Sequence, residues 1–249
     1  MQADLHSSIA CQPVAICGKL ILMLRVSIIV PTLNEAAGIR APLAALQPLR
    51  AAGHEVIVAD GGSADATPDI ARPWVDRVLQ APRGRARQMN AGAAAAGGDV
   101  FWFLHADTLP PRGADRLICQ GLEASGRGWG RFDVRLSGRH SLLRVVERLQ
   151  NRRSRLTGVA TGDQAMFVRR ALFESVGGFP DVALMEDVAL SRALKRHGPP
   201  LCLPEPVVTS SRRWERKGIV RTILLMWRLR LAYALGADPR RLARLYERA

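Results

Sequence analysis

The chain has 249 residues, of which 48% are hydrophobic, and a mean hydropathy of +0.01. It can therefore bury a full core, which excludes a disordered or fibrous protein. The formal net charge is +14, so we expect anionic partners, namely nucleotide phosphates, nucleic acid or an acidic membrane face. Residues 212–249 hold eleven Arg or Lys against three acids, an excess of eight that is over half of the total.

The N-terminal segment and the cysteines are typical of a cytoplasmic protein. Residues 1–24 have no basic region, and Gly18 and Lys19 interrupt their apolar stretch, so they do not resemble a signal peptide. We expect a poorly structured extension, with Met23 as an alternative initiator. The sequence contains no run of about 18 uncharged apolar residues, so no membrane span is predicted. The cysteines have neither CxxC spacing nor neighbouring histidines, which predicts neither a zinc site nor a disulfide framework; they are Cys11, Cys17, Cys119 and Cys202.

From residue 26 onward, strands alternate with helices. Apolar runs predict buried strands at 26–30, 55–60 and 100–105, and RVLQ at 77–80 predicts a further strand between the last two. An apolar repeat over 39–49 predicts a helix after the first strand, and a helix of small residues follows the basic segment that begins at Pro82. Four strand-helix units in about 80 residues predict a parallel sheet with right-handed crossovers.

Polar residues follow three of these strands, and each has a binding and a structural interpretation. Asp60, beside two glycines, could accept a hydrogen bond from a base or a ribose, or it could cap the following turn. Asn34 and Glu35 could likewise contact a ligand or cap the next helix. Asp107 follows the fourth strand, at the edge where open α/β sheets bind ligands. We therefore place the expected site around this carboxylate.

Five motifs occur in a characteristic order. They are PTLNE after the first strand, ADGGS with Asp65 and Thr67 after the second, FLHADT after the fourth, TGDQAMFVRRALFESVGGFP at 161–180 and ALMEDVALSRAL at 183–194. Over roughly residues 25–215, this series resembles glycosyltransferase family 2, the inverting enzymes of the GT-A fold. Together with the tail from SRRWER to LARLY, the RGRARQMNAGA and FLHADT segments are most similar to a bacterial subgroup often associated with arsenosugar pathways.

The resemblance implies a fold and an activity. The fold is α/β, a GT-A (Rossmann-like) domain at 25–215 with a mixed, mostly parallel sheet flanked by helices, followed by a basic amphipathic helical tail at 216–249. The implied reaction transfers a sugar in one step from a UDP- or GDP-linked donor to a hydroxyl acceptor. Neither the sugar nor the acceptor can be identified from the residues, because pocket shape decides them.

Donor binding is implied for residues at the ends of the first strands. Asp60 would contact the base. Of three arginines near residue 85, Arg85 is the best candidate for the diphosphate because Gly84 lets the backbone turn beneath it, although such a cluster could equally be a solvated surface. The implied donor residues are Pro31, Thr32, Asn34, Glu35, Asp60, Ser63, Arg85 and Asp107.

A divalent cation, Mg²⁺ or Mn²⁺, would neutralise the departing diphosphate. Family members usually have a D-x-D pair at this point, but here His105 takes the place of the first acid. The metal would then be held by Asp107, with His105 either as a softer ligand that favours manganese or as a strand-end histidine that does not touch metal.

Acceptor binding is implied for the second half of the domain. Asp187, with Glu186 beside it, matches the family's general base, which takes the proton from the attacking hydroxyl. The two acids could instead cap the helix predicted over 186–197. Gly162, Asp163 and Gln164 would line the acceptor side, although Asp163 could be purely structural.

Arg213 and Trp214 partly match the Q-x-x-R-W motif of processive family members. Ser210 stands where the glutamine would be, so processivity is not expected. Arg213 could meet the diphosphate or the acceptor. Trp214 could stack on a sugar, or it could pack beneath the tail.

The tail has two interpretations. Residues 219–235 are apolar on nearly every helical face, with Arg221 and Arg228 on one side, and Pro239 begins a second, basic helix. The first helix either docks on the domain or lies in a membrane interface, peripheral to the inner face of the plasma membrane. A nucleic-acid partner is not expected, because no aromatic residues interleave the basic ones.

Two functions from other classes stay open. The missing first acid at position 105 is compatible with a catalytically silent protein that only binds nucleotide sugars. A basic scaffold that binds membrane or nucleic acid through residues 212–249 would explain the charge, but it would leave the motif series unexplained.

Overall fold

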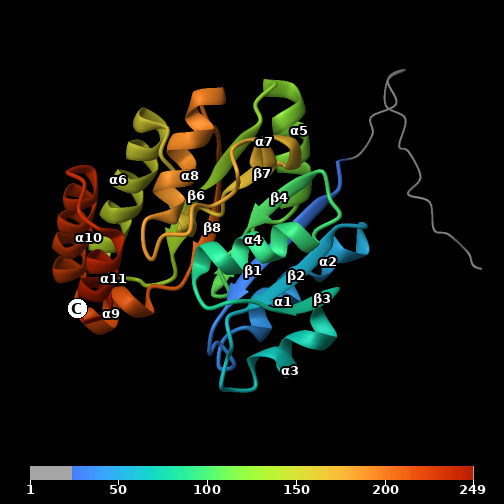
Figure 1. The fold of residues 1–249 in the computed structure, drawn as a ribbon, viewed down its shortest axis with the longest axis horizontal. Helices are drawn as coiled ribbons and strands as arrows, with labels where there is room; N and C mark the ends of the chain where they lie inside the picture. Colours follow the sequence, from blue (N-terminus) through green and yellow to red (C-terminus); the bar gives the residue numbers. More distant parts are fainter. Residues whose placement is uncertain (1–23, 249) are drawn as a thin grey trace, which may run out of the picture.

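The computed structural model describes residues 24–248 (Figure 1). Apart from Leu24, the expected N-terminal extension lies outside these residues. The chain is organised around one eight-stranded sheet. Its strands are β1 (Val26–Thr32), β2 (Glu55–Asp60), β3 (Arg77–Gln80), β4 (Val100–Phe103), β5 (Thr108–Leu109), β6 (Trp129–Leu136), β7 (Phe167–Arg169) and β8 (Leu201–Thr209).

The sheet is mixed and mostly parallel, as predicted. The four predicted strands form one half in the order β3-β2-β1-β4, and all three of their pairings are parallel. In the other half β6 is parallel to β8, whereas β7 is antiparallel to β4 and β6, and β5 is antiparallel to β8. The predicted end of the fourth strand at 105 was wrong by two residues. The chain turns there, and the carbonyl of His105 accepts a hydrogen bond from the amide of Thr108.

Helices cover both faces of the sheet (Figure 1). They are α1 (Arg40–Ala45), α2 (Gln47–Ala51), α3 (Thr67–Ala71), α4 (Arg85–Ala95), α5 (Ala114–Ser125), α6 (Ser141–Thr157), α7 (Arg170–Ser175), α8 (Glu186–Leu194), α9 (Arg212–Lys217), α10 (Ile219–Ala234) and α11 (Pro239–Arg248), with 3₁₀ turns η1 (Arg72–Trp74), η2 (Gly162–Gln164) and η3 (Lys195–His197).

Two helix predictions need correction. The helix expected over 39–49 is divided into α1 and α2, because Pro48 has no amide hydrogen to donate to a carbonyl one turn earlier. The helix expected over 186–197 ends at Leu194 and continues as the 3₁₀ turn η3.

The core forms two layers, because successive residues of each strand point to opposite faces. Val56, Val58 and Trp102 pack on one face, with the apolar residues of α1, α2 and α5. Ile57 and Phe101 pack on the other face, with α4, α7 and α8. β1, β2 and β4 are therefore buried on both sides, which is why their sequences are almost continuously apolar, whereas β3 at the sheet edge is partly exposed.

The carboxyl ends of β1, β2 and β4 meet at one edge of the sheet. Thr32 and Asp60 are paired in register at the ends of β1 and β2, and His105 and Asp107 follow β4. The edge is closed on its far side by the 3₁₀ turn η2 and the start of α8. This arrangement brings the segments that carry the sequence motifs together.

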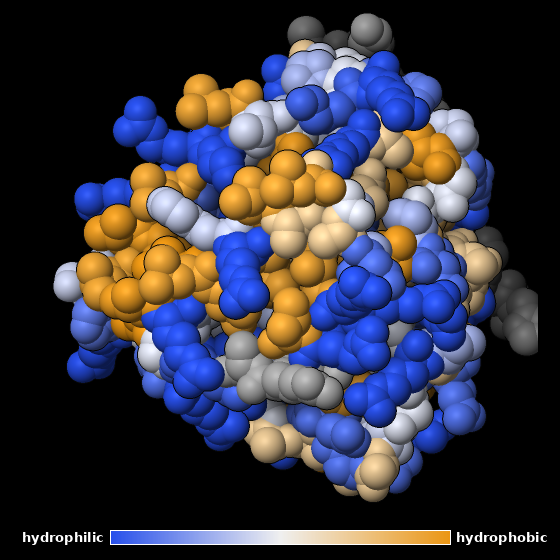
Figure 2. Space-filling model, turned by 60° about the vertical axis from the view of Figure 1, so that its left-hand side comes forward, coloured by the Kyte–Doolittle hydropathy of each residue, from blue (hydrophilic) through white to orange (hydrophobic). Residues whose placement is uncertain are grey.

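The tail helices dock on the domain. Leu229 of α10 and Leu242 of α11 pack against Met185 and Val188 at the start of α8, and all four side chains are buried. Figure 1 places α10 beside α6, and Figure 2 shows apolar side chains on the surface at this end of the molecule. Within residues 24–248, no helix has the length and apolar character needed to cross a bilayer.

Candidate functional site

A cavity of about 550 Å³ opens at this edge of the sheet. Its wall combines the loops after β1 and β4, the starts of α4 and α8, the turn η2, the end of β8 and the tail helices. The structure brings most of the predicted site residues to this wall. They are Pro31, Thr32, Glu35, Arg85, His105, Asp107, Gly162, Asp163, Glu186, Asp187, Arg213 and Trp214.

Four predicted residues do not line the cavity: Asn34, Asp60, Ser63 and Gln164. The carboxylate of Asp60 accepts hydrogen bonds from the Thr32 hydroxyl at 3.0 Å, from the amides of Gly62 and Ser63 at 3.0 and 2.8 Å, and from the Ser63 hydroxyl at 2.5 Å. The geometry is that of the structural alternative, in which Asp60 holds its own turn. Its contact with a base stays a prediction.

Asn34 and Ser63 fasten the loop after β1 to the loop after β2. Asn34 has a positive φ of 54°. Its side-chain oxygen accepts a hydrogen bond from the backbone amide of Ala64 at 2.8 Å, and its backbone amide donates to the Ser63 hydroxyl at 2.9 Å. Gln88 of α4 supports these loops from below, since it donates to the carbonyl oxygens of Thr32 and Ala59 at 2.7 and 2.8 Å. The backbone that follows β1 and β2 is therefore held in place.

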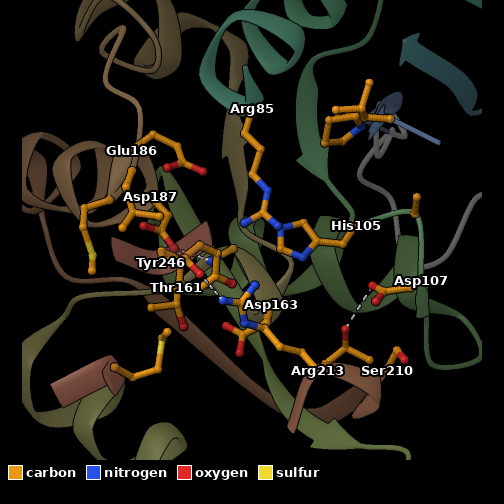
Figure 3. Close-up of a pocket in the computed structure, with 18 of the residues that line it drawn as sticks. Arg85, His105, Asp107, Thr161, Asp163, Glu186, Asp187, Ser210, Arg213 and Tyr246 are labelled. Carbon is orange, nitrogen blue, oxygen red and sulfur yellow. Dashed lines mark hydrogen bonds between the residues drawn. The ribbon is translucent and has the colours of Figure 1, made fainter. Parts of the chain in front are cut away.

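Figure 3 shows Asp107 on one side of the cavity and the Glu186–Asp187 pair on the other, with Arg85 and His105 between them. Removal from water in the cavity lowers the pKa of Arg85, but the negative groups around it, Glu186 foremost, outweigh this effect and raise that pKa. Arg85 is thus a permanent cation. Arg230 of α10 also lines the cavity, so its potential suits a diphosphate.

His105 lies between the two sides of the cavity. A Cβ atom placed on Gly162 would come within 2.7 Å of the Nε2 atom of His105, so this position needs glycine to let the η2 backbone approach the imidazole. Burial, and then the charge of Arg85, lower the pKa of His105. Its ring is therefore neutral at physiological pH and retains a lone pair.

Asp107 is half-buried, and its Oδ1 atom accepts a hydrogen bond from the Thr209 hydroxyl at 3.3 Å. No cluster of three or more His, Cys, Asp or Glu side chains that could hold a metal ion occurs within the described part of the chain. The protein can supply the Asp107 carboxylate and the neutral His105 imidazole. This donor set fits Mg²⁺ or Mn²⁺, which keep several water ligands and take others from a substrate's phosphates.

The acid pair opens α8 from a strained backbone. Met185, which precedes it, has a φ of 69°, and this turn directs Asp187 toward η2. The Asp187 carboxylate is half-buried and accepts the amides of Gly162 and Val188, both at 2.7 Å. Glu186 is buried, and burial, together with the charge of Asp187, raises its pKa to about 7. Glu186 therefore gains and loses its proton near neutral pH.

The raised pKa of Glu186 predicts a stability effect. Between about pH 4.5 and 7 the folded state binds this proton more tightly than the unfolded state, so stability falls as the pH rises, and the whole penalty is present above pH 7. Glu186→Gln should therefore increase the free energy of unfolding at pH 8 by up to about 3 kcal/mol, with a much smaller gain at pH 5. Denaturant titrations at both pH values measure this.

The matched control is Glu123→Gln, which neutralises an exposed acid on α5 and should give the same small change at both pH values. An equal effect of Glu186→Gln at pH 5 and pH 8 would contradict the assigned protonation of Glu186.

The turn η2, whose residues are predicted to line the acceptor side, is held in place by hydrogen bonds from α6. Gln150 of α6 donates to the Asp163 carboxylate at 2.6 Å and to the Thr161 hydroxyl at 2.9 Å. The Oδ1 atom of Asp163 is buried and has no partner among the described residues. Gln164 is fully buried, and its side-chain oxygen accepts the Thr161 amide. Gln164 thus shapes the turn, and Asp163 presents an unused acceptor atom.

Arg213 joins the tail to the cavity wall. Its guanidinium lies 3.5 Å from the ring centroid of Tyr246 and donates to the Tyr246 carbonyl at 2.6 Å. The neighbouring Arg212 pairs with Glu35 at 3.4 Å. Arg212 thus connects α9 to the loop after β1, and Arg213 connects α9 to α11.

Several cavity residues were not found by sequence reasoning. Gln88 sits within a helix of small residues, where only its size marks it. The tail residues reach the cavity through docking, which no local pattern predicts. These residues are Gln88, Thr209, Met226, Leu229, Arg230 and Tyr246.

Comparison with known proteins identifies a family and a fold. The family model "Glycosyl transferase family 2" matches residues 27–175. The probable glycosyltransferase YdaM of Bacillus subtilis (strain 168) is 28% identical over 236 residues, which cover 85% of this chain and 55% of that protein. The chain thus spans about half the length of this curated relative.

Solved structures agree with the fold. S. aureus TarS superposes with a TM-score of 0.63 at 18% identity, over 75% of this chain and 37% of that one. The mannosyltransferase PcManGT from Pyrobaculum calidifontis, in complex with GDP-Man and Mn²⁺, superposes with a TM-score of 0.57 at 26% identity, over 76% of this chain and 57% of that one. The glucosyl-3-phosphoglycerate synthase from Mycobacterium tuberculosis, in complex with Mn²⁺, UDP and phosphoglyceric acid, superposes with a TM-score of 0.58 at 19% identity, over 86% of this chain and 80% of that one.

Proposed function

Because this chain belongs to glycosyltransferase family 2, we propose that it transfers a sugar from a nucleotide-diphosphate donor to a hydroxyl acceptor in one inverting step. The observation that carries this proposal is the placement of Asp107 and Asp187 on opposite sides of one cavity, with Arg85 between them (Figure 3). Direct displacement at an anomeric carbon needs a base on the side opposite the leaving group. The two carboxylates meet that requirement.

On the donor side, Arg85 provides a fixed positive charge for the diphosphate. Asp107, assisted by His105, would hold Mg²⁺ or Mn²⁺. When bound, the metal would supply charge neutralisation for the departing nucleoside diphosphate. The loops fastened by Asn34, Asp60 and Ser63 would receive the nucleoside. PcManGT, which is 26% identical, was solved with GDP-Man and Mn²⁺, which supports a donor and a metal of this kind.

On the acceptor side, Asp187 would take the proton of the attacking hydroxyl. Its carboxylate is held in place by the amides of Gly162 and Val188, and each of its oxygens retains a lone pair for the proton. Burial and the charge of Asp187 raise the pKa of the neighbouring Glu186 to about 7.

The proposal extends to the identity of the sugar and of the acceptor. The resemblance to bacterial enzymes associated with arsenosugar pathways indicates where the sugar and the acceptor should first be sought. Asp163 and Trp214 line the same cavity as Asp187 and would contact the acceptor.

The test is a calorimetric titration of the full chain with UDP and with GDP, each with and without Mn²⁺. We expect one nucleotide to bind, and manganese to strengthen its binding by about tenfold or more. That result would also identify the base of the donor. A folded protein that binds neither nucleotide would contradict the proposal, and binding without turnover of the corresponding sugar donors would favour the silent binding protein.

A further inference from the structure

The exposed apolar side chains of this protein are gathered at one end. Among residues 24–248, eleven large hydrophobic side chains are exposed, and all except Leu109 belong to α6, α10, α11 or the residue that ends α10. Soluble surfaces normally scatter such residues singly. The gathering of ten on adjacent helices therefore requires a separate explanation.

On α10 the exposed residues form one row. Val220, Leu224, Trp227 and Leu231 recur at helical spacing and are 58, 62, 65 and 63% exposed. The opposite face of the helix carries Leu229, which is buried against α8 and α11. The helix has thus already used one apolar face for docking, and a second apolar face is left in solvent.

A second row lies on α6, which runs beside α10 (Figure 1). It consists of Leu142, Val145, Leu149 and Leu156, which are 38 to 84% exposed. We call the two rows together the apolar face. Figure 2 shows apolar side chains from this end of the molecule as a broad area bordered by hydrophilic ones.

Basic side chains surround the apolar face. Nine exposed Arg or Lys side chains lie on the four helices α6, α9, α10 and α11 at this end, and none of them forms an ion pair with an acid of the described chain. They are Arg148, Arg152, Arg216, Lys217, Arg221, Arg228, Arg240, Arg241 and Arg244. Arg221 and Arg228 are seven residues apart on α10, at the margin of the exposed row, where long side chains can extend toward phosphates.

We propose that this apolar face, formed by α6 and α10 and rimmed by arginines, docks on the surface of an anionic lipid bilayer. The aliphatic side chains and Trp227 would enter the boundary between headgroups and acyl chains, and the arginines would contact lipid phosphates. Charge complementarity selects this occupant. A second copy of the chain would bring an equally basic rim against the first, which like-charge repulsion opposes.

Docking in this way would place the cavity close to the lipid surface. The side of α10 that is turned away from the apolar face contributes Met226, Leu229 and Arg230 to the cavity wall. One helix diameter, about 10 Å, therefore separates the apolar face from the cavity. The inference does not depend on the proposed transferase activity, since it rests only on the outer surface.

The test is flotation of the full chain with vesicles of phosphatidylcholine alone or with about one third phosphatidylglycerol. We expect binding to the anionic vesicles, weak binding to the neutral ones, and loss of binding at high salt. Leu224→Ser with Trp227→Ser should reduce the bound fraction by about tenfold or more, because these large apolar side chains would no longer enter the interface. Arg221→Glu with Arg228→Glu should have a similar effect.

Two matched controls lie elsewhere on the protein. Among residues 24–248, Leu109 is the one exposed large hydrophobic side chain away from this end, and Arg72 on η1 is 70% exposed. Neither Leu109→Ser nor Arg72→Glu should change flotation. Equal flotation of the wild type and the Leu224/Trp227 variant, or no flotation of the wild type, would overturn the proposal. So would a wild-type dimer that the same variant converts to a monomer in size-exclusion chromatography.

Discussion

Asp187→Asn is expected to lower turnover by about 10²–10⁴-fold while nucleotide binding changes little. The amide keeps the shape of the carboxylate but cannot take the proton of the attacking hydroxyl. It can still accept one of the two backbone hydrogen bonds from Gly162 and Val188, so the start of α8 should keep its position. Turnover is measured as release of the nucleoside diphosphate from the matching sugar donor, and binding is measured by calorimetry.

A second readout distinguishes a lost base from a distorted site. The charge of Asp187 contributes to the raised pKa of Glu186, so in the Asn variant that pKa should move down toward its usual value. The fall in stability between pH 5 and pH 8 should therefore become smaller. Asp181→Asn, an exposed acid before α8 that pairs with Arg87, is the control and should keep nearly full turnover. Full turnover by Asp187→Asn would show that another group is the base.

Asp107→Ala is expected to remove the metal-dependent part of nucleotide binding. Asp107 is the carboxylate that follows β4 in the cavity wall, and within residues 24–248 no cluster of three ligands could hold the cation without it. The variant should therefore bind the nucleotide equally with and without Mn²⁺, a loss of about tenfold or more relative to the wild type with metal. Calorimetric titrations at matched metal concentrations measure the difference.

Two further variants make this result specific. Asp69→Ala removes an acid on α3 that is 82% exposed and controls for the change in net charge; it should leave metal dependence intact. His105→Gln should alter the preference for Mn²⁺ over Mg²⁺ if the imidazole is a ligand, because nitrogen ligands favour manganese of the two. Undiminished stimulation by manganese in Asp107→Ala would mean that the metal is held elsewhere.

Strand prediction succeeded in the first half of the chain for a physical reason. The parallel strands β1, β2 and β4 are buried on both faces, so their sequences are continuously apolar and stand out. In the second half, β8 contains Pro204 and Pro206 and alternates in burial, and β6 has a register shift between Phe132 and Asp133. Such strands depend on their partners for definition, so no local pattern identifies them.

The tail illustrates an ambiguity that only packing resolves. The sequence shows α10 to be apolar on nearly every face, which allows both docking and membrane contact. The structure uses Leu229 and Met226 for docking against the domain and leaves Leu224, Trp227 and Leu231 in solvent. Docking is therefore confirmed for one face of α10, whereas membrane contact by the exposed face stays a prediction.

What the sequence by itself determined is the edge at which the site lies. Asp60 and Asp107 follow strands that must be parallel, and the carboxyl ends of parallel strands meet at one edge of a sheet. The order of the motifs likewise indicated the family. Both inferences need only local composition and chain order, which the sequence contains.

Only the tertiary structure decided which of these polar groups are available to a ligand. The oxygens of Asp60 are occupied by Thr32 and Ser63, whereas Asp107 and Asp187 face the cavity. The pKa of Glu186 and the closing of the cavity by Arg230 and Tyr246 also depend on segments far apart in the chain. Availability and protonation are set by burial and by neighbouring charges, and these exist only once the distant segments have packed together.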